Sequence, residues 1–124
     1  MNLVRSLGVQ AWLSYTIDGI RTRAGQPLTE AFAVAAGVAE IVAVGVNCCA
    51  PDDVLPAIEM ASATGKPVIV YPNSGERWDG RAWTGPSRFS SQVAGQWVAA
   101  GAHIVGGCCR VRPADIAELA AALT

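Results

Sequence analysis

The chain has few of the features that mark a membrane protein or a nucleic-acid-binding protein. No apolar run approaches the roughly 20 residues that a membrane-spanning helix needs. The 124 residues include 9 Lys and Arg and 10 Asp and Glu, for a formal net charge of −1, and these charges are scattered singly rather than in blocks. The sequence therefore predicts a protein that binds neither a membrane nor nucleic acid.

Two further absences bear on location and redox state. The first five residues lack the apolar stretch and small-residue cleavage site of a signal peptide, so we expect a cytoplasmic protein. Its four cysteines should then be reduced, which makes metal binding a better explanation for them than disulfides. No Cys-x-x-Cys motif occurs, and this disfavours a small redox protein that uses vicinal thiols.

What the sequence does contain is a strand followed by a helix, four times over. Residues are 52% hydrophobic, and apolar runs at 11–17, 41–46, 67–71 and 102–106 are typical of strands. Helices are predicted over 29–38, from 51 to Gly65, from Ser87 and over 113–123, with loops at 21–27 and 72–86. Four such units predict an α/β fold with a parallel sheet and right-handed crossovers. The sheet is either an open, doubly wound one or half of a (β/α)8 barrel, which needs about 250 residues.

Two cysteine pairs follow the second and fourth predicted strands. Cys48 and Cys49 come after 41–46, and Cys108 and Cys109 come after 102–106. Because the carboxyl ends of parallel strands lie at one edge of a sheet, these thiols are expected to converge, and converging thiolates suit zinc. Gly106 and Gly107 are expected to supply unusual backbone angles for two successive ligands. The alternative, small buried thiols, stays open from the residues alone.

Three thiolates on zinc leave a fourth coordination position open, which is the catalytic arrangement. Such a site carries a net charge of −1 and suits an incoming thiol, which as a thiolate can attack an electrophilic methyl group. A sulfonium donor would be attracted to the negative site and to aromatic faces. The aromatic candidates are Tyr15, Tyr71, Trp78 and Trp83, although plain packing explains the two tyrosines equally well.

Three motifs carry a resemblance to a known family. Gly45-Val46-Asn47-Cys48 and Gly106-Gly107-Cys108-Cys109 resemble the two zinc motifs of the homocysteine S-methyltransferase family. The run Tyr71-Pro72-Asn73-Ser74-Gly75-Glu76 is similar to that family's loop after the next-to-last strand, and it points to the branch that uses S-methylmethionine. The resemblance covers essentially the whole chain and aligns it with the C-terminal half of a family member.

The resemblance implies that residues 1–124 form strands five to eight of a (β/α)8 barrel with their helices. It implies Cys48, Cys108 and Cys109 as ligands of Zn²⁺, and leaves Cys49 as a small buried or loop thiol. Homocysteine would add its sulfur as the fourth ligand and accept a methyl group from a sulfonium donor such as S-methylmethionine, giving methionine. Asn47 and Asn73 are candidates for substrate binding, and their alternative role is turn formation.

The first four βα units of a family member have no counterpart in this sequence, nor does the acidic residue expected after the fourth strand. We therefore expect methyl transfer to need an N-terminal half, supplied by self-association or by a complementary half-barrel. Whether the chain is an enzyme by itself stays open. The alternative is a non-catalytic, truncated remnant that binds zinc but lacks a substrate pocket.

Overall fold

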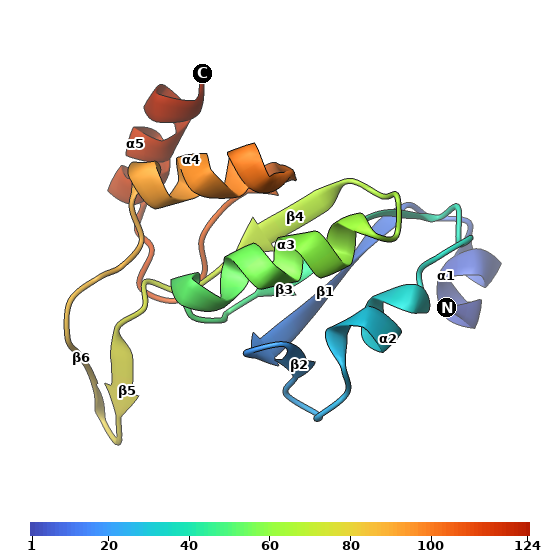
Figure 1. Cartoon of the computed structure of the whole chain (residues 1–124), viewed down its shortest axis with the longest axis horizontal. Coiled ribbons are helices and arrows are strands. Elements are labelled where there is room, and N and C mark those ends of the chain that lie inside the picture. The colour runs from blue at the N-terminus through green and yellow to red at the C-terminus, as the bar shows by residue number, and fades with distance from the viewer.

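Four parallel strands form the main sheet of the computed structural model, which describes residues 1–124 (Figure 1). Their order is β1-β3-β4-β7, with β2 antiparallel at the outer edge of β1, and β5 and β6 form a separate hairpin. The strands are β1 (Ala11–Asp18), β2 (Arg21–Thr22), β3 (Ile41–Asn47), β4 (Val68–Tyr71), β5 (Arg77–Asp79), β6 (Ala82–Thr84) and β7 (Ala102–Val105). The helices are α1 (Asn2–Leu7), α2 (Leu28–Ala33), α3 (Val54–Ser62), α4 (Ser91–Ala100) and α5 (Pro113–Leu123), with a 3-10 turn η1 (Pro51–Asp53). None of these helices has the length and apolar character needed to cross a membrane.

The predicted α/β fold with a mostly parallel sheet is confirmed, and the differences lie in the helix ends and the connections. The helix predicted over 29–38 ends at Ala33 and is followed by turns. Residues 77–84, predicted as loop, form the β5–β6 hairpin, in which Trp78 lies opposite Trp83 with ring centroids 5.5 Å apart. Cross-strand aromatic pairs of this kind stabilise two-stranded ribbons. The helix predicted to begin at Ser87 is α4, and it begins at Ser91. The Ser90 hydroxyl caps it by accepting a hydrogen bond from the Val93 N–H.

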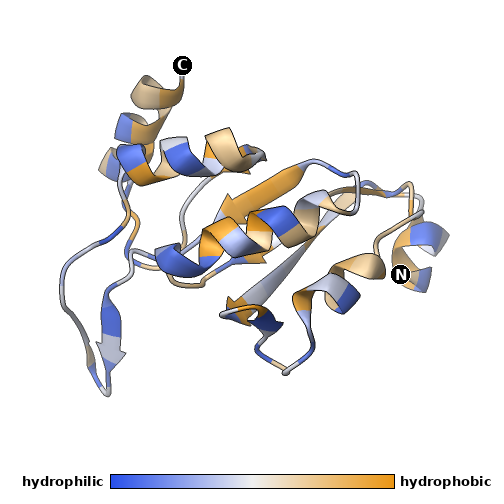
Figure 2. Ribbon diagram, in the orientation of Figure 1, coloured by the Kyte–Doolittle hydropathy of each residue, from blue (hydrophilic) through white to orange (hydrophobic).

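The hydrophobic core lies between the sheet and helices α2, α3 and α4, which cover one face (Figure 1). Alternate residues of β3 and β4, such as Val44 and Val70, are fully buried on this face, and β4 is apolar along its length (Figure 2). The largest buried side chains, Phe32 of α2 and Trp97 of α4, fill the space beneath the helices. Packing against the helices accounts for the apolar residues that β3 and β4 present on this face.

The opposite face of the sheet has no helix against it. Side chains alternate between the two faces of a strand, so Trp12, Ile69 and Tyr71 point away from the helices. Ile104 joins them because a register shift between β4 and β7 places it opposite Ile69. Trp12 is 57% exposed and Ile104 is 50% exposed, although both belong to strands of the main sheet. An apolar sheet face thus lies open to solvent on the side away from the helices.

Candidate metal centre

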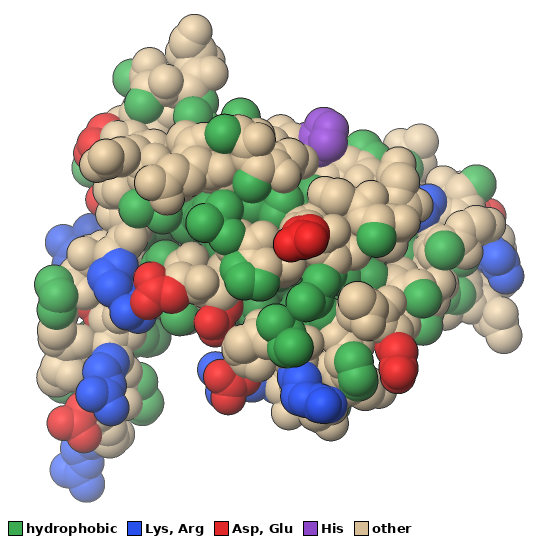
Figure 3. All heavy atoms as spheres, in the orientation of Figure 1, with side chains coloured by type: hydrophobic (Ala, Val, Ile, Leu, Met, Phe, Trp, Pro, Cys, Tyr) green, Lys and Arg blue, Asp and Glu red, His purple; other side chains and the backbone are tan.

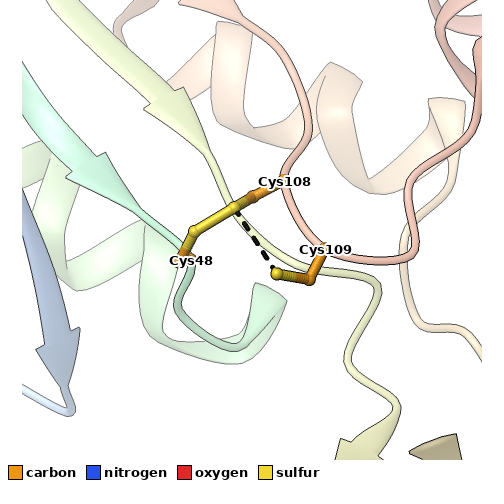
Figure 4. A group of neighbouring side chains, drawn as sticks. All are labelled: Cys48, Cys108 and Cys109. Atoms are coloured by element: carbon orange, nitrogen blue, oxygen red, sulfur yellow. Dashed lines mark hydrogen bonds between the residues drawn. A yellow bond between two sulfur atoms is a disulfide. The ribbon is translucent and has the colours of Figure 1, made fainter.

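Three cysteines meet at the carboxyl edge of the main sheet. Cys48 directly follows β3, and Cys108 and Cys109 lie in the loop between β7 and α5. Their sulfur atoms all lie within 4.8 Å of one another, and those of Cys108 and Cys109 are 3.9 Å apart (Figure 4). The convergence expected from the order of strands is confirmed, because β4 lies between β3 and β7 and holds their ends close together.

The redox state of the cluster differs from the expectation of free thiols. Cys48 and Cys108 are joined in a disulfide with their Cα atoms 5.5 Å apart, whereas Cys109 is free and exposed. The pairing follows from the strand order, which brings these two residues within disulfide range. Metal ligation uses thiolates, so only the reduced form of the cluster can hold a metal ion.

The reduced cluster fits a soft, tetrahedral metal ion. Zinc binds thiolate sulfur at about 2.3 Å, which places two sulfur ligands about 3.8 Å apart in a tetrahedral site. The 3.9 Å between the sulfurs of Cys108 and Cys109 matches this separation. Thiolates favour soft metal ions, zinc among them, over hard cations such as magnesium.

The loop that follows β4 is a backbone template for both cysteine segments. It lies between them and hydrogen-bonds to each mainly through main-chain atoms, with one further bond from the Asn73 side-chain amide to the Cys48 carbonyl at 3.5 Å. The main-chain bonds are from Cys48 N to Tyr71 O (3.1 Å), from Cys108 N to Pro72 O (2.8 Å), from Asn73 N to Cys49 O (2.9 Å) and from Ser74 N to Cys109 O (3.0 Å). The cluster geometry is therefore fixed by residues 71–74 as much as by the cysteines themselves.

The expectation that Gly106 and Gly107 supply unusual backbone angles is wrong. Neither glycine is left-handed; the strained residues are Cys48 (φ 49°) and Arg110 (φ 66°). Gly107 is needed for a different reason, because a Cβ there would lie 2.2 Å from Cγ1 of Val111. At Gly106 an added Cβ would make only an ordinary contact of 3.5 Å. Gly107 is therefore needed because the Val111 side chain packs closely against it, and not because of its backbone angles.

The two candidate asparagines are hydrogen-bonded to the protein itself. Asn47 accepts from the Ser14 hydroxyl at 2.6 Å and donates to Thr16 at 3.3 Å, which ties the end of β3 to β1. Asn73 accepts from the Gly75 N–H at 2.7 Å, the turn-forming role weighed as its alternative. Substrate contacts by Asn47 and Asn73 stay a prediction.

Cys49 stands apart from the other three thiols. It is fully buried in the hydrophobic core, as expected of a small packed thiol. Burial, with a smaller contribution from the negative charge of Asp53, raises the pKa of Cys49 to about 12. A thiol that stays protonated in this way is a poor metal ligand and a poor nucleophile.

The candidate aromatic residues are spread over the molecule. Tyr15 packs against Phe32 and donates a hydrogen bond to Ala31 O, so it belongs to the core. Trp78 and Trp83 lie on the β5–β6 hairpin, which projects from the body of the molecule and carries arginine side chains (Figures 1 and 3). Only Tyr71 lies beside the cysteine segments.

Beside the cysteines, the open face of the sheet is hollowed. The hollow has a volume of about 210 Å³ and is lined by Trp12, Ile69, Tyr71, Ile104, Gly106 and Gly107. The Trp12 indole N–H donates a hydrogen bond to the Tyr71 hydroxyl at 3.2 Å, which sets the two rings against each other. Sequence reasoning did not single out Trp12, although the alternation along β1 places it on the face opposite Tyr15 and could have identified it.

One carboxylate lies in the loop that joins the two cysteine segments. Glu76 accepts a hydrogen bond from the Ser74 hydroxyl at 2.7 Å and forms an ion pair with Arg110 at 3.2 Å. These two contacts, the first the larger, lower the pKa of Glu76 below its ordinary value. Arg110 directly follows Cys109, so the pair connects the template loop to the end of the cysteine cluster.

Three cysteines at the carboxyl edge of a parallel α/β sheet place the chain among α/β proteins with a candidate cysteine metal site. Residues 1–123 match the model of one family, described as homocysteine S-methyltransferase. The chain belongs to the homocysteine S-methyltransferase family, and the resemblance found in its motifs is confirmed.

Known relatives extend beyond the region matched here. The chain is 41% identical over 119 residues to the homocysteine S-methyltransferase of Escherichia coli (strain K12), covering 90% of this chain and 38% of that protein. It is 38% identical over 117 residues to a selenocysteine Se-methyltransferase of Brassica oleracea var. italica, covering 87% and 34%. The chain thus spans little more than a third of the length of these relatives.

Solved structures of the homocysteine methyltransferase MmuM from Escherichia coli share the fold. Its metallated form superposes with a TM-score of 0.78 at 35% identity, covering 97% of this chain and 38% of that one. Its oxidised form superposes with a TM-score of 0.74 at 37% identity, covering 96% and 39%. The arrangement of strands and helices described above is therefore that of a segment of the MmuM fold.

Proposed function

We propose that this chain takes part in zinc-dependent methyl transfer from a sulfonium donor, such as S-methylmethionine, to homocysteine, giving methionine. The observation that carries the proposal is the cluster of three sulfurs within 4.8 Å at the carboxyl edge of the sheet, in a chain of this family. Cys48, Cys108 and Cys109 would hold the ion, and a reducing, cytoplasmic setting would keep them as thiols.

Zinc bound there would supply an open coordination position, at which the homocysteine sulfur is held as a thiolate at neutral pH. The methyl carbon then leaves the sulfonium sulfur as it bonds to the homocysteine sulfur, and the positive charge of the donor is lost. Asn47 and Asn73, which flank the cluster, would orient the substrate. The chain's own contribution is to place the sulfur acceptor beside a surface that suits the donor.

The hollow beside the cluster is where we place the donor. Trp12 and Tyr71 line it, and aromatic faces attract a sulfonium cation. The thiolate centre would carry a net charge of −1, which favours a cationic donor over a neutral one. An exposed aromatic surface next to the cysteines thus supports the choice of a sulfonium as methyl source.

The open sheet face supports a further part of the proposal. We place residues 1–124 as strands five to eight of a (β/α)8 barrel, with a complementary half covering Trp12 and Ile104. Sedimentation of purified residues 1–124 tests whether a second copy supplies that half, because a monomer would reject self-association. Closing the barrel would bury the exposed apolar face and cover the edge of β7 together with the part of the β1 edge that β2 leaves unpaired.

Metal analysis of the reduced, purified protein, run beside a methionine-forming assay with homocysteine and S-methylmethionine, tests the function. Stoichiometric zinc with methionine formed supports it. Zinc without turnover, alone and after mixing with candidate N-terminal halves, would favour the alternative of a zinc-binding module that lacks activity. Absence of zinc after reduction and reloading would reject the ligand set.

A further inference from the structure

The third cysteine of the cluster is held differently from the other two. Cys48 directly follows a strand, and Cys108 is bound through its N–H to the Pro72 carbonyl. Cys109 lies further out and is exposed, and its neighbour Arg110 has a left-handed backbone (φ 66°). Its sulfur is nevertheless close to that of Cys108, so other contacts must fix the segment.

Ser74 supplies the first of these contacts. This residue is 1% exposed and its N–H donates to the Cys109 carbonyl at 3.0 Å. Its own carbonyl accepts from the Arg88 N–H, and its hydroxyl donates to Glu76 at 2.7 Å. Every polar atom of Ser74 is therefore engaged, and the residue links the Cys109 backbone to the Glu76 carboxylate.

Glu76 supplies the second contact, from the other side of Cys109. The same oxygen that accepts from Ser74 also accepts from Nε of Arg110 at 3.2 Å. Its side chain is only 16% exposed, so the ion pair is less open to solvent than a typical surface pair. This one carboxylate oxygen therefore accepts from Ser74, which hydrogen-bonds to the Cys109 carbonyl, and from Arg110, which follows Cys109 in the sequence.

We propose that Glu76 is a positioning residue for the metal centre, which acts through Ser74 and Arg110 to hold Cys109 where it can serve as a ligand. The proposal rests on the proposed function for its metal, and on the observed contacts for its geometry. Groups that orient metal ligands without touching the ion typically alter metal affinity 10- to 100-fold when removed. We expect Glu76 to have an effect of about this size.

Zinc affinity of the reduced protein, measured by competition with a chromogenic chelator, tests the proposal. Glu76→Ala should weaken binding about 10- to 100-fold. Glu76→Gln, whose amide oxygen can still accept both hydrogen bonds, should restore most of the affinity. Asp52→Asn is the matched control, since it removes the ion pair of the Arg88 side chain (Arg88–Asp52, 2.6 Å) and leaves the contacts of Glu76 with Ser74 and Arg110 in place.

A double-mutant cycle separates positioning from a general structural effect. If Glu76 acts through Cys109, Glu76→Ala should have no further effect on zinc affinity in a Cys109→Ser background. Equal losses in both backgrounds would overturn the proposal. If Glu76→Ala lowers the melting temperature too far to be measured, Arg110→Ala breaks the same ion pair and takes its place in the cycle.

A metal-free measurement distinguishes failure of this proposal from failure of the proposed function. Hydrogen exchange of the Ser74 N–H, which reports its bond to the Cys109 carbonyl, should be several-fold faster in Glu76→Ala than in wild type or Asp52→Asn. If the wild-type protein binds no zinc but exchange is still faster in Glu76→Ala than in wild type, the positioning role stands and the metal function is rejected. Unchanged exchange would reject the positioning role.

Discussion

Among the glycines of the chain, Gly45 is the one at which an added Cβ would lie nearest to another atom, and it gives the sharpest test of the fold. Gly45 lies in β3 opposite Ile69 of β4, two residues before the strand ends at the cysteine segment. A Cβ added at Gly45 would lie 1.6 Å from the Ile69 carbonyl oxygen, a backbone atom that cannot rotate away. Gly45→Ala should therefore force β3 and β4 apart.

The size of the effect follows from what the separation breaks. Relieving the clash requires more than an ångström of movement, which disrupts the neighbouring hydrogen bonds between β3 and β4. Two or three such bonds at about 1 kcal/mol each, with loss of packing behind them, give a destabilisation of about 3–5 kcal/mol. Because Cys48 follows β3 directly, zinc binding by the reduced protein should weaken as well.

Urea unfolding followed by circular dichroism measures the effect, with Gly95→Ala as the matched control. Gly95 lies inside α4, and a Cβ there would meet no atom within 4 Å. Alanine favours a helix interior over glycine by about 0.5–1 kcal/mol, so this variant should be more stable than wild type. A Gly45→Ala protein within 0.5 kcal/mol of wild type would refute the reasoning about strand spacing.

Four other predictions concern the thiols and a helix cap. Cys108→Ser should remove most of the zinc bound by the reduced protein and Cys49→Ser should not, as metal analysis of both variants would show; full zinc occupancy in Cys108→Ser contradicts the ligand set. With its pKa raised to about 12, Cys49 should resist alkylation at pH 8 while Cys109 reacts, and mass spectrometry of the peptides checks this. The stability that Cys49 contributes as a neutral thiol should be complete below pH 9 and fall as the pH rises toward 12, so Cys49→Ser should flatten the decline in urea midpoint over this range. Ser90→Ala should cost about 1 kcal/mol, because the hydroxyl caps α4 through the Val93 N–H, and a urea midpoint equal to that of wild type would contradict it.

The main sheet could be predicted from the sequence because its central strands have a strong signal. Residues 41–47 and 68–71 are apolar at almost every position, a run that is typical of central strands in a parallel sheet. The β5–β6 hairpin was missed because its strands are three residues each and lie in a segment rich in Gly, Pro and charge. A single cross-strand pair, Trp78 with Trp83, stabilises it, and one pair is too few to produce the alternating pattern that predicts a strand.

The cysteine cluster could be predicted for a topological reason, and its details could not. Strand order alone places Cys48 and Cys108 at one edge, whatever the loops do. The backbone bonds of the template loop use main-chain atoms, which every residue has, so no residue type reports them. The role of Gly107 was misassigned for a similar reason, since its close approach to Val111 depends on the path of a loop.

The hydrogen bonds that position the cysteines join residues of this chain, and they lie at the carboxyl edge of the sheet, where β3, β4 and β7 end. The open face, in contrast, exposes Trp12 and Ile104, where the proposed donor site and the complementary half would meet. Ligand geometry and substrate enclosure therefore depend on different parts of the molecule. We expect zinc affinity to be the same whether or not the open face is covered, and methyl transfer to depend on that cover.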